Sequence, residues 1–252
     1  MPRFFLPSDA FSNGGENEAS ELVIRGEDAF HLASVLRVKP GEEVVACSAS
    51  GTEFFCAVSE ILEERKNCRV LLTIKERRLS ENEPKTAIRV FQGMPKGKKT
   101  DLVIQKCVEL GAGEIFLVYS DRSVPLRDGE GDAKKRARFQ KIADEAAKQC
   151  GRGKLVKVGL LPSFDEALKE MEQSQTRFVC FEAEEERSVK EEIRKPCESL
   201  SFFVGPEGGL SQRELLLCRG SGIPSVSLGK RILRTETCAA AVLSMILYEK
   251  EL

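Results

Sequence analysis

Two glycine-containing stretches in the last third of the chain have the residue types of a ligand-binding site. Residues 205–209 read Gly-Pro-Glu-Gly-Gly and directly follow the apolar run 200–204, and residues 229–237 follow a short strand candidate at 225–228. Glycines permit backbone conformations and close approaches that a Cβ forbids, while Pro206 fixes one backbone angle and removes a donor. Such turns can bring backbone groups against a bound molecule. The pattern therefore predicts that the two stretches bind a ligand.

Each stretch lies between a predicted strand and a predicted helix. Residues 200–204 and 225–228 have strand character, and a helix is expected after each turn, the second over 238–248. Ser211 with Glu214 three residues later is typical of a capping box, which places a helix start there. In open α/β sheets, ligands bind outside the carboxyl ends of the strands. We therefore expect both turns to face one crevice.

The chain upstream of these turns alternates between strand and helix patterns. Strands are expected over 88–92, 114–119, 155–158 and 177–181, and helices over 100–110, 133–149 and 164–171. Ser163 with Glu166 predicts a second capping box at the start of the last of these helices. The alternation favours a mainly parallel α/β sheet.

The beginning of the chain has a different pattern. One helix is expected over 27–36, with Phe30, Ala33 and Leu36 on its apolar face and Leu32 and Val35 beside them. Around it, short runs with strand character are separated by turn signals, and they lie at 22–24, 43–47, 54–61 and 69–74. The next residues are polar and charged and contain Pro84, as is typical of a linker. The sequence thus predicts three parts: a small β-barrel domain over 1–75, a linker over 76–86 and an α/β domain over 87–252.

Composition and motif checks exclude several classes of function. The 252 residues are 41% hydrophobic and 31% charged, and no apolar run reaches the ~18 residues of a membrane span. The N-terminus lacks the pattern of a secretory signal, so we expect a cytoplasmic protein with no membrane partner. Nine cysteines with no Cys-x-x-Cys pair, and one histidine, predict reduced thiols and no metal site. Residues 93–100 imitate a phosphate-binding loop with the wrong spacing, and the glycine pairs elsewhere lack the full dinucleotide-binding fingerprint.

Basic residues are concentrated in one segment. Between Lys134 and Lys157 the chain has nine lysines and arginines against two acidic residues, although its net charge is only −1. A basic face is the electrostatic feature expected of a nucleic-acid-binding protein, since phosphate contacts supply much of the affinity. An ordinary solvated helix face has the same composition, and charge alone does not separate the two interpretations.

Several motifs together resemble a known family. Residues 203–214, FVGPEGGLSQRE, and residues 228–241, LGKRILRTETCAAA, are similar to the cofactor-binding loops of the SPOUT methyltransferases. Within that superfamily they most resemble ribosomal RNA small subunit methyltransferase E, which methylates N3 of a uridine in small-subunit ribosomal RNA. Residues 31–44, 96–123 and 141–155 are also similar to segments of this family. In the last of them Cys150 replaces the usual serine, and Leu155-Val156 stands where a proline is common.

The resemblance implies a fold and a cofactor. The fold would be an N-terminal PUA-like β-barrel domain followed by a SPOUT α/β domain with a C-terminal trefoil knot, and the cofactor would be S-adenosyl-L-methionine. The two turns and a third loop after Phe181 would wrap this cofactor, with apolar walls from leucine and isoleucine side chains. The residues expected to bind it are Phe181, Glu182, Gly205, Pro206, Glu207, Gly208, Leu210, Leu228, Gly229, Ile232, Leu233 and Thr237.

The resemblance also implies partners. The substrate would be small-subunit (16S) ribosomal RNA, free or assembled in the 30S particle. The protein would form a homodimer, for which the apolar helix over 238–248 is a candidate interface. In the PUA-like domain Arg3, His31 and Arg37 would face the RNA, although His31 also fits an ordinary half-buried histidine. In the α/β domain the candidate RNA contacts are Arg122, Lys134, Lys135, Arg136, Arg138 and Arg152.

Methylation of uridine N3 requires loss of a weakly acidic proton. Arg234 is the candidate for stabilising negative charge on the uracil carbonyls, and Glu236 is the candidate for accepting the proton directly or through water. Glu236 also fits a first-turn carboxylate favoured by the helix dipole, and Glu207 also fits a structural acceptor of backbone donors. Two other functions stay open: a ribose 2′-O-methyltransferase of the same superfamily, and a non-catalytic RNA-binding ribosome-assembly factor.

Overall fold

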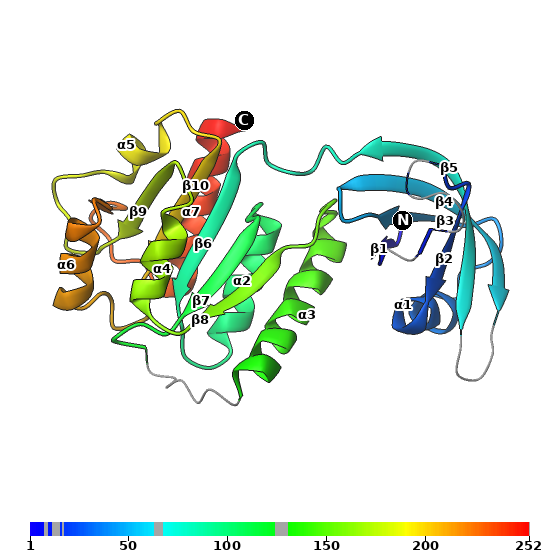
Figure 1. Cartoon of the computed structure of the whole chain (residues 1–252), viewed down its shortest axis with the longest axis horizontal. Helices are drawn as coiled ribbons and strands as arrows, with labels where there is room; N and C mark the ends of the chain where they lie inside the picture. The colour runs from blue at the N-terminus through cyan, green and yellow to red at the C-terminus, as the bar shows by residue number, and fades with distance from the viewer. Residues whose placement is uncertain (8–9, 12–15, 17, 63–67, 124–130, 252) are drawn as a thin grey trace. The chain divides into compact units, whose positions relative to one another are not determined.

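The computed structural model of the chain describes residues 1–7, 10–11, 16, 18–62, 68–123 and 131–251. These residues form two compact units (Figure 1). Unit 1 consists of Met1–Glu83 with Ala147–Leu155, and unit 2 consists of Pro84–Ala146 with Val156–Leu252. The sequence patterns did not predict that residues 147–155 belong with the first unit.

Unit 1 contains a five-stranded sheet in the order β1-β3-β4-β5-β2. β1 pairs with β3 in parallel, and the other neighbouring strands are antiparallel. Alternate side chains of these strands point into one apolar core, which includes Leu22, Phe54 and Leu72. The strands are β1 (Arg3–Phe5), β2 (Glu21–Arg25), β3 (Glu43–Cys47), β4 (Thr52–Leu62) and β5 (Arg69–Leu79). The expected β-rich first domain is confirmed, and β1 is a strand that the sequence patterns missed.

The helix expected over 27–36 is present but buries a different face. α1 (Gly26–Phe30) continues into a π-helical turn, η1 (His31–Val35), in which Leu36 N donates to His31 O at 2.9 Å. The buried side chains are Ala29, Leu32 and Ala33, whereas Phe30 is 58% and Leu36 43% exposed. The predicted apolar face was therefore wrong for Phe30 and Leu36. The observed buried positions still have the i, i+3, i+4 spacing of a helix, but they start one residue earlier.

Unit 2 contains a six-stranded sheet in the order β11-β9-β10-β6-β7-β8, and all of its pairs are parallel. The central strands β6 and β10 are buried along most of their length, as expected for a parallel sheet covered on both faces. The strands are β6 (Ala87–Gly93), β7 (Glu114–Val118), β8 (Lys157–Leu161), β9 (Thr176–Cys180), β10 (Ser199–Val204) and β11 (Ser225–Val226). The predicted parallel α/β sheet is confirmed, and the trefoil knot stays a prediction.

Two helices of unit 2, α4 and α6, begin after the serines that the sequence predicted as their N-caps. In α6 the Ser211 hydroxyl accepts from Glu214 N at 3.1 Å, and the Glu214 carboxylate accepts from Ser211 N at 2.8 Å. In α4 the Ser163 hydroxyl caps Glu166 N, but the Glu166 carboxylate pairs with Lys169 and does not close the predicted box. The helices are α2 (Lys99–Glu109), α3 (Asp132–Cys150, whose last turn belongs to unit 1), α4 (Phe164–Met171), α5 (Val189–Ile193), α6 (Gln212–Gly220) and α7 (Thr235–Lys250).

The strand order creates a switch point between β6 and β10. From β6 the chain moves outward through β7 and β8, then returns to the other side of β6 for β9 and β10. The loops that leave β6 and β10 consequently start side by side at the carboxyl edge of the sheet, which is where ligands bind in such folds. α7 follows the last loop and packs against α2. Among the described residues, every helix is too short or too polar to cross a lipid bilayer.

Candidate functional site

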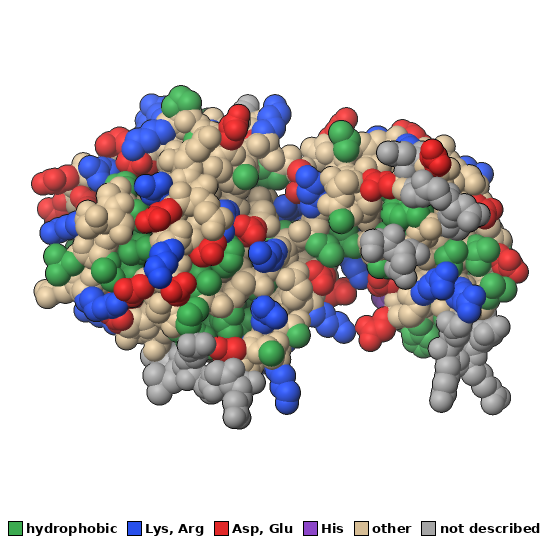
Figure 2. Space-filling model, viewed as in Figure 1, with side chains coloured by type: hydrophobic (Ala, Val, Ile, Leu, Met, Phe, Trp, Pro, Cys, Tyr) green, Lys and Arg blue, Asp and Glu red, His purple; other side chains and the backbone are tan. Residues whose placement is uncertain are grey.

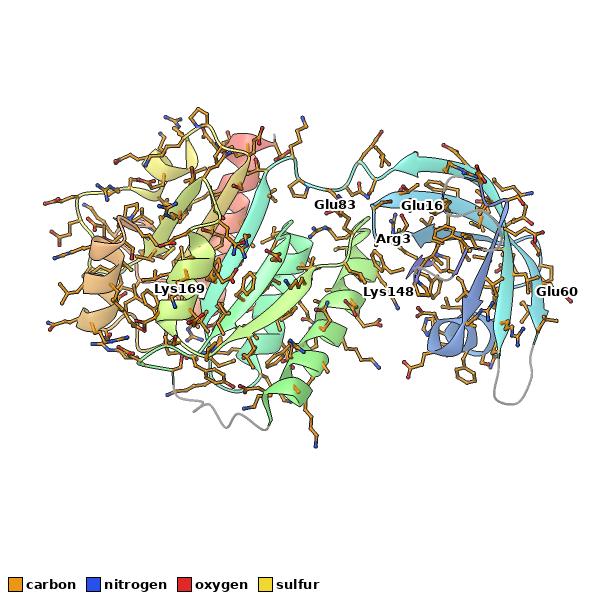
Figure 3. The ribbon with its side chains drawn as sticks, viewed as in Figure 1. Arg3, Glu16, Glu60, Glu83, Lys148 and Lys169 are labelled. Atoms are coloured by element: carbon orange, nitrogen blue, oxygen red, sulfur yellow. The ribbon has the colours of Figure 1, made fainter. Side chains whose placement is uncertain are left out.

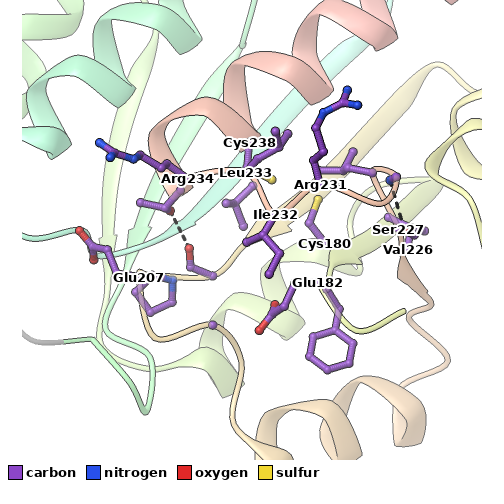
Figure 4. A pocket seen from close by; sticks show the side chains of 18 of the residues that line it. Cys180, Glu182, Glu207, Val226, Ser227, Arg231, Ile232, Leu233, Arg234 and Cys238 are labelled. Atoms are coloured by element: carbon purple, nitrogen blue, oxygen red, sulfur yellow. Dashed lines mark hydrogen bonds between the residues drawn. The ribbon is translucent and has the colours of Figure 1, made fainter. Parts of the chain in front are cut away.

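A cavity of about 400 Å³ opens at the carboxyl ends of β9, β10 and β11 (Figure 4). Three loops form its walls, and they follow β9, β10 and β11. The lining residues are Lys99, Cys180, Phe181, Glu182, Val204, Gly205, Pro206, Glu207, Gly209, Val226, Ser227, Leu228, Gly229, Arg231, Ile232, Leu233, Arg234, Thr235 and Cys238. The expectation that the two glycine-containing turns face one crevice is therefore confirmed.

A buried hydrogen-bond chain joins the two turns. Thr235, in the first turn of α7, donates from its hydroxyl to Gly205 O at 2.7 Å. Gln92, at the end of β6, donates from Nε2 to the Thr235 hydroxyl at 2.8 Å and to Gly93 O at 2.9 Å. Gln92 and Thr235 are both buried. The two hydrogen bonds of the Thr235 hydroxyl hold the second turn against the first, while the Gln92 Oε1 atom is buried with no hydrogen-bond partner among the described residues.

Two glycines allow the close packing around the first turn. A Cβ built on Gly93 would lie 2.5 Å from Pro206 Cδ and 2.7 Å from Pro206 N, so a side chain there would displace the turn. Gly209 has φ +68°, and its Cβ would lie 2.7 Å from Glu182 Oε1. The left-handed backbone favours glycine at this position. The Glu182 carboxylate is thus packed directly against the turn inside the cavity.

A lysine joins two carboxylates beside the same turn. Lys99 Nζ lies 3.2 Å from Glu207 Oε1 and 3.4 Å from Glu236 Oε2. Burial alone would raise the pKa of Glu207, but backbone N–H groups of Glu207 and Lys96 and the Lys99 ammonium lower it. The hydrogen bond to Glu207 also raises the pKa of Lys99. Lys99 and Glu207 are therefore charged at neutral pH, and Glu207 has the structural role with backbone donors that the sequence suggested.

Other parts of the cavity wall are apolar or neutral, while Arg231 and Arg234 add two cations to the lining. Ile232 and Leu233 line the cavity from the last loop, and Ile232 is 81% exposed. Cys180 and Cys238 lie at its inner end, where a hydrogen bond between them, together with burial, raises the pKa of the Cys180 thiol well above its usual value. None of the nine cysteines, all of which lie in the described part of the chain, forms a disulfide. The thiol of Cys180 is consequently neutral and contributes an uncharged wall.

Most of the predicted cofactor residues meet in the cavity, and four predicted residues lie beside it. Gly208 packs against Arg122, whose guanidinium donates to Gly208 O at 2.9 Å. Leu210 belongs to the apolar core under the turn. Thr237 and Glu236 lie in the first turn of α7, and neither is a lining residue. Sequence reasoning missed Lys99, although a helix start directly after a central strand is a recognisable position for a site residue.

Two of the predicted RNA contacts in unit 1 have carboxylate partners. Arg3 donates to Glu53 at 2.7 Å, and Arg152 donates to Glu83 at 2.9, 3.1 and 2.7 Å (Figure 3 labels Arg3 and Glu83). Glu83 also accepts from Gly153 N at 2.8 Å. Arg152 is only 4% exposed, which favours a structural role over a phosphate contact. The Arg3 side chain is largely buried as well.

The other predicted RNA contacts are closer to solvent. His31 and Arg37 are exposed, and Arg37 has φ +54°, an uncommon backbone conformation for a residue with a side chain. Lys134, Arg136 and Arg138 are exposed on α3, where Arg138 pairs with Asp101, while the neighbouring Lys135 is half-buried. On the face shown in Figure 2, basic side chains are interspersed with acidic ones.

Comparisons with known proteins identify the family to which the chain is similar. A model of an RNA methyltransferase domain matches residues 81–247, and a model of an RNA methyltransferase PUA domain matches residues 24–71. The chain is 35% identical to ribosomal RNA small subunit methyltransferase E of Bacillus subtilis (strain 168), over 100% of this chain and 98% of that relative. It also resembles the crystal structure of ribosomal RNA small subunit methyltransferase E from Neisseria gonorrhoeae bound to S-adenosyl methionine. That structure gives a TM-score of 0.83 and 29% identity, over 98% of this chain and 97% of the other.

Proposed function

The chain belongs to the ribosomal RNA small subunit methyltransferase E family, and we propose that it methylates N3 of a uridine in 16S ribosomal RNA. It is an S-adenosylmethionine-dependent ribosomal RNA methyltransferase. The cavity between the two glycine-containing turns is the observation that supports this proposal most directly. Its volume of about 400 Å³ is within the range of small-molecule sites.

The residues of the cavity fit a methyl donor with an adenine, a ribose and a sulfonium. Backbone groups of the two turns are available for the adenine and ribose, and Leu233 and Ile232 supply apolar surface. The Glu182 carboxylate, packed against Gly209, provides negative charge within the cavity. S-adenosylmethionine supplies an electrophilic methyl group when it is bound. The protein must then align the uridine and assist the loss of its N3 proton.

Arg234 and Glu236 remain the catalytic candidates, but they lie at different positions relative to the cavity. Arg234 is exposed and lines the cavity, so its guanidinium can reach the uracil carbonyls of a bound nucleotide. Glu236 has a side chain only 14% exposed and lies behind Lys99. Its buried Oε2 atom pairs with Lys99 Nζ at 3.4 Å and has no other hydrogen-bond partner among the described residues. This arrangement supports an action of Glu236 through Lys99 or an intervening water more than a direct contact with the uridine.

The exposed cations are the proposed RNA-binding surface. In unit 2 these are Arg122 and the α3 residues Lys134, Arg136 and Arg138, with Lys135 beside them. The Arg122 guanidinium also donates a hydrogen bond to Gly208 O, so this proposed RNA contact lies against the turn at residues 205–209. In unit 1, His31 and Arg37 are the better placed candidates, because Arg3 and Arg152 are engaged by carboxylates. The substrate is either free ribosomal RNA or the 30S particle, and the cytoplasm is where this substrate is found.

A second copy of the chain is the proposed partner of the α2–α7 face. α2 and α7 pack together, and they expose large apolar side chains, as does the loop before α7. These side chains are Leu102, Met245, Tyr248 and Ile232. A homodimer would cover them and would bring the partner close to the cavity through Ile232. Sedimentation equilibrium should give twice the chain mass of 27.9 kDa.

Nucleoside mass spectrometry tests the proposed reaction. Small-subunit RNA from a deletion strain, as free RNA or as 30S particles, is incubated with the purified protein and S-adenosylmethionine. One new 3-methyluridine is expected in the RNA. A 2′-O-methylated ribose would replace the proposal with the ribose methyltransferase alternative. No methylation of either substrate, together with no binding of S-adenosylmethionine by calorimetry, would favour a non-catalytic assembly factor.

A further inference from the structure

Lys99 occupies a position that joins three parts of the site. It is the first residue of α2, directly after the loop that leaves β6, and it lines the cavity. Its ammonium lies 3.2 Å from Glu207 in the turn after β10 and 3.4 Å from Glu236 in the first turn of α7. A surface lysine is usually flexible, but two carboxylates from separate elements restrict this one. The ammonium is therefore held at the cavity wall.

A stabilising ion pair alone does not account for this arrangement. The Lys99 side chain is 37% exposed, and exposed ion pairs contribute little to stability. The Glu236 carboxylate is largely buried, and in the described part of the chain the Lys99 ammonium at 3.4 Å is the only partner of its Oε2 atom. Burying a carboxylate beside one lysine costs free energy of desolvation. We therefore expect the pair to have a role other than stability. Placing a fixed positive charge at a reacting centre is such a role.

The chemistry of uridine N3 needs a positive charge. When the N3 proton leaves, the electron pair stays on the uracil ring, and negative charge spreads to the O2 and O4 carbonyl oxygens. Preorganised cations or donors at developing negative charge are among the largest contributions to catalysis. Lys99 cannot act as the base, because its contacts with Glu207 and Glu236 favour the protonated ammonium. Its available role is to stabilise the uracil anion.

We infer that Lys99 is a catalytic residue whose ammonium contacts a uracil carbonyl oxygen, and that Glu207 and Glu236 hold it there. This inference rests on the proposed function. In the step it assists, the N3 proton passes to water, N3 forms a bond to the methyl carbon, and the carbon–sulfur bond breaks with its electron pair on sulfur. The products are 3-methyluridine, S-adenosylhomocysteine and one released proton. Besides Lys99 and Glu207, the charged side chains that line the cavity are Glu182, Arg231 and Arg234.

The dependence of kcat on pH tests the inference with Lys99→Met, Lys99→Arg and a control, Lys169→Met. Lys169 is an exposed α4 residue that pairs with Glu166 (Figure 3). If the ammonium lowers the pKa of bound uridine N3, Lys99→Met should lower kcat about 100-fold at pH 7. The deficit should shrink as pH rises toward 9.5, because hydroxide then assists the ionisation. Lys99→Arg keeps the charge and should stay within about tenfold of the wild type, and the control should match the wild type.

Cofactor binding gives a second readout that needs no turnover. Lys99→Met leaves Glu207 and Glu236 without their cation, so a positively charged sulfonium should bind better relative to the neutral thioether. Calorimetry should show the preference for S-adenosylmethionine over S-adenosylhomocysteine rising about fivefold or more. The inference is overturned if Lys99→Met lowers kcat by the same factor at every pH. It is also overturned if Lys99→Met leaves the preference for S-adenosylmethionine over S-adenosylhomocysteine unchanged. If the wild type itself does not methylate uridine N3, the proposed function and this inference both fail.

Discussion

Thr235 donates a 2.7 Å hydrogen bond from its hydroxyl to the carbonyl oxygen of Gly205, across 30 residues of sequence. The bond joins the loop that follows β11 to the turn that follows β10. Because Thr235 also accepts from the buried Gln92, neither partner can turn away without leaving a polar group unsatisfied. The cavity between the two loops thus has a fixed shape before any ligand binds.

Removing this bond should weaken cofactor binding. Thr235→Val keeps the shape of the side chain but leaves Gly205 O and Gln92 Nε2 without their shared partner. Affinity for S-adenosylmethionine should fall about tenfold, equivalent to about 1.4 kcal/mol. Calorimetry measures this change. Thr73→Val is the control, since Thr73 bonds to Ser59 on the surface of unit 1, and it should leave affinity unchanged. Equal affinities for all three proteins would show that the bond does not shape the cavity.

A methyl group at Gly93 should disrupt the first turn. Gly93→Ala places a carbon 2.5 Å from the Pro206 ring, a distance that requires the turn to move. Overpacking of this kind costs about 1–3 kcal/mol, so the melting temperature should fall and cofactor affinity should drop more than tenfold. Gly220→Ala is the matched control, because its Cβ would meet nothing within 4 Å. Wild-type affinity in Gly93→Ala would contradict the close packing of Gly93 on Pro206.

The Arg152–Glu83 pair should contribute to stability rather than to RNA binding. Arg152→Met leaves a buried carboxylate unpaired and should destabilise the chain by about 3 kcal/mol. Urea unfolding followed by circular dichroism suits a protein without tryptophan. If Arg152 contacts phosphate instead, the variant should keep its stability and lose RNA affinity. Arg78→Met, which removes a partly exposed partner of Glu53, provides the comparison.

The same pair predicts a pH dependence of stability. Burial alone would raise the pKa of Glu83, but Arg152 and the backbone N–H groups of Gly153 and Lys154 lower it below 4.5. A carboxylate with a lowered pKa in the folded state contributes stability above its unfolded pKa, and this is lost as pH falls through the folded value. The free energy of unfolding should therefore decrease as the pH drops below about 4.5, and the decrease should be less steep in Glu83→Gln. Identical slopes in the two proteins would contradict the assignment.

The α3 cations should determine part of the salt dependence of RNA binding. Lys134→Gln with Arg136→Gln removes two exposed charges, so the slope of log affinity against log salt should flatten by about 1.5. Cofactor affinity should stay at the wild-type value. Fluorescence anisotropy with a labelled small-subunit RNA fragment measures the slope, and Lys169→Gln is the control from a different helix. An unaltered slope in the double variant would place the RNA elsewhere.

Sequence patterns were reliable for most elements whose structure is set by a local signal, although the capping box at Ser163 and the apolar face of the helix at 27–36 were exceptions. The apolar run before Gly205 became β10, and Ser211 with Glu214 fixed the start of α6 through two reciprocal bonds. The predicted strand over 155–158 was displaced, because residues 147–155 join unit 1 and β8 begins only at Lys157. Local periodicity carries no information about such a long-range arrangement.

The site was only partly predictable for the same reason. The glycines and the Arg234-to-Thr237 segment were visible as loop residues between a strand and a helix. Lys99 lies more than 100 residues before both Glu207 and Glu236 in the sequence. A loop whose path the sequence does not reveal separates the two glutamates, so their meeting with Lys99 could not be predicted. Arg152 looked like an RNA contact from its charge, and its burial against Glu83 became visible only in the folded unit.

A crystal structure with S-adenosylhomocysteine tests the central claim most directly. The claim is that the turn at residues 205–209 and the loop at residues 228–234 together bind one methyl donor. Electron density for the whole ligand is expected in the cavity between them, in contact with Gly205 and Leu233. Density at any other position, with this cavity left to solvent, would contradict the account.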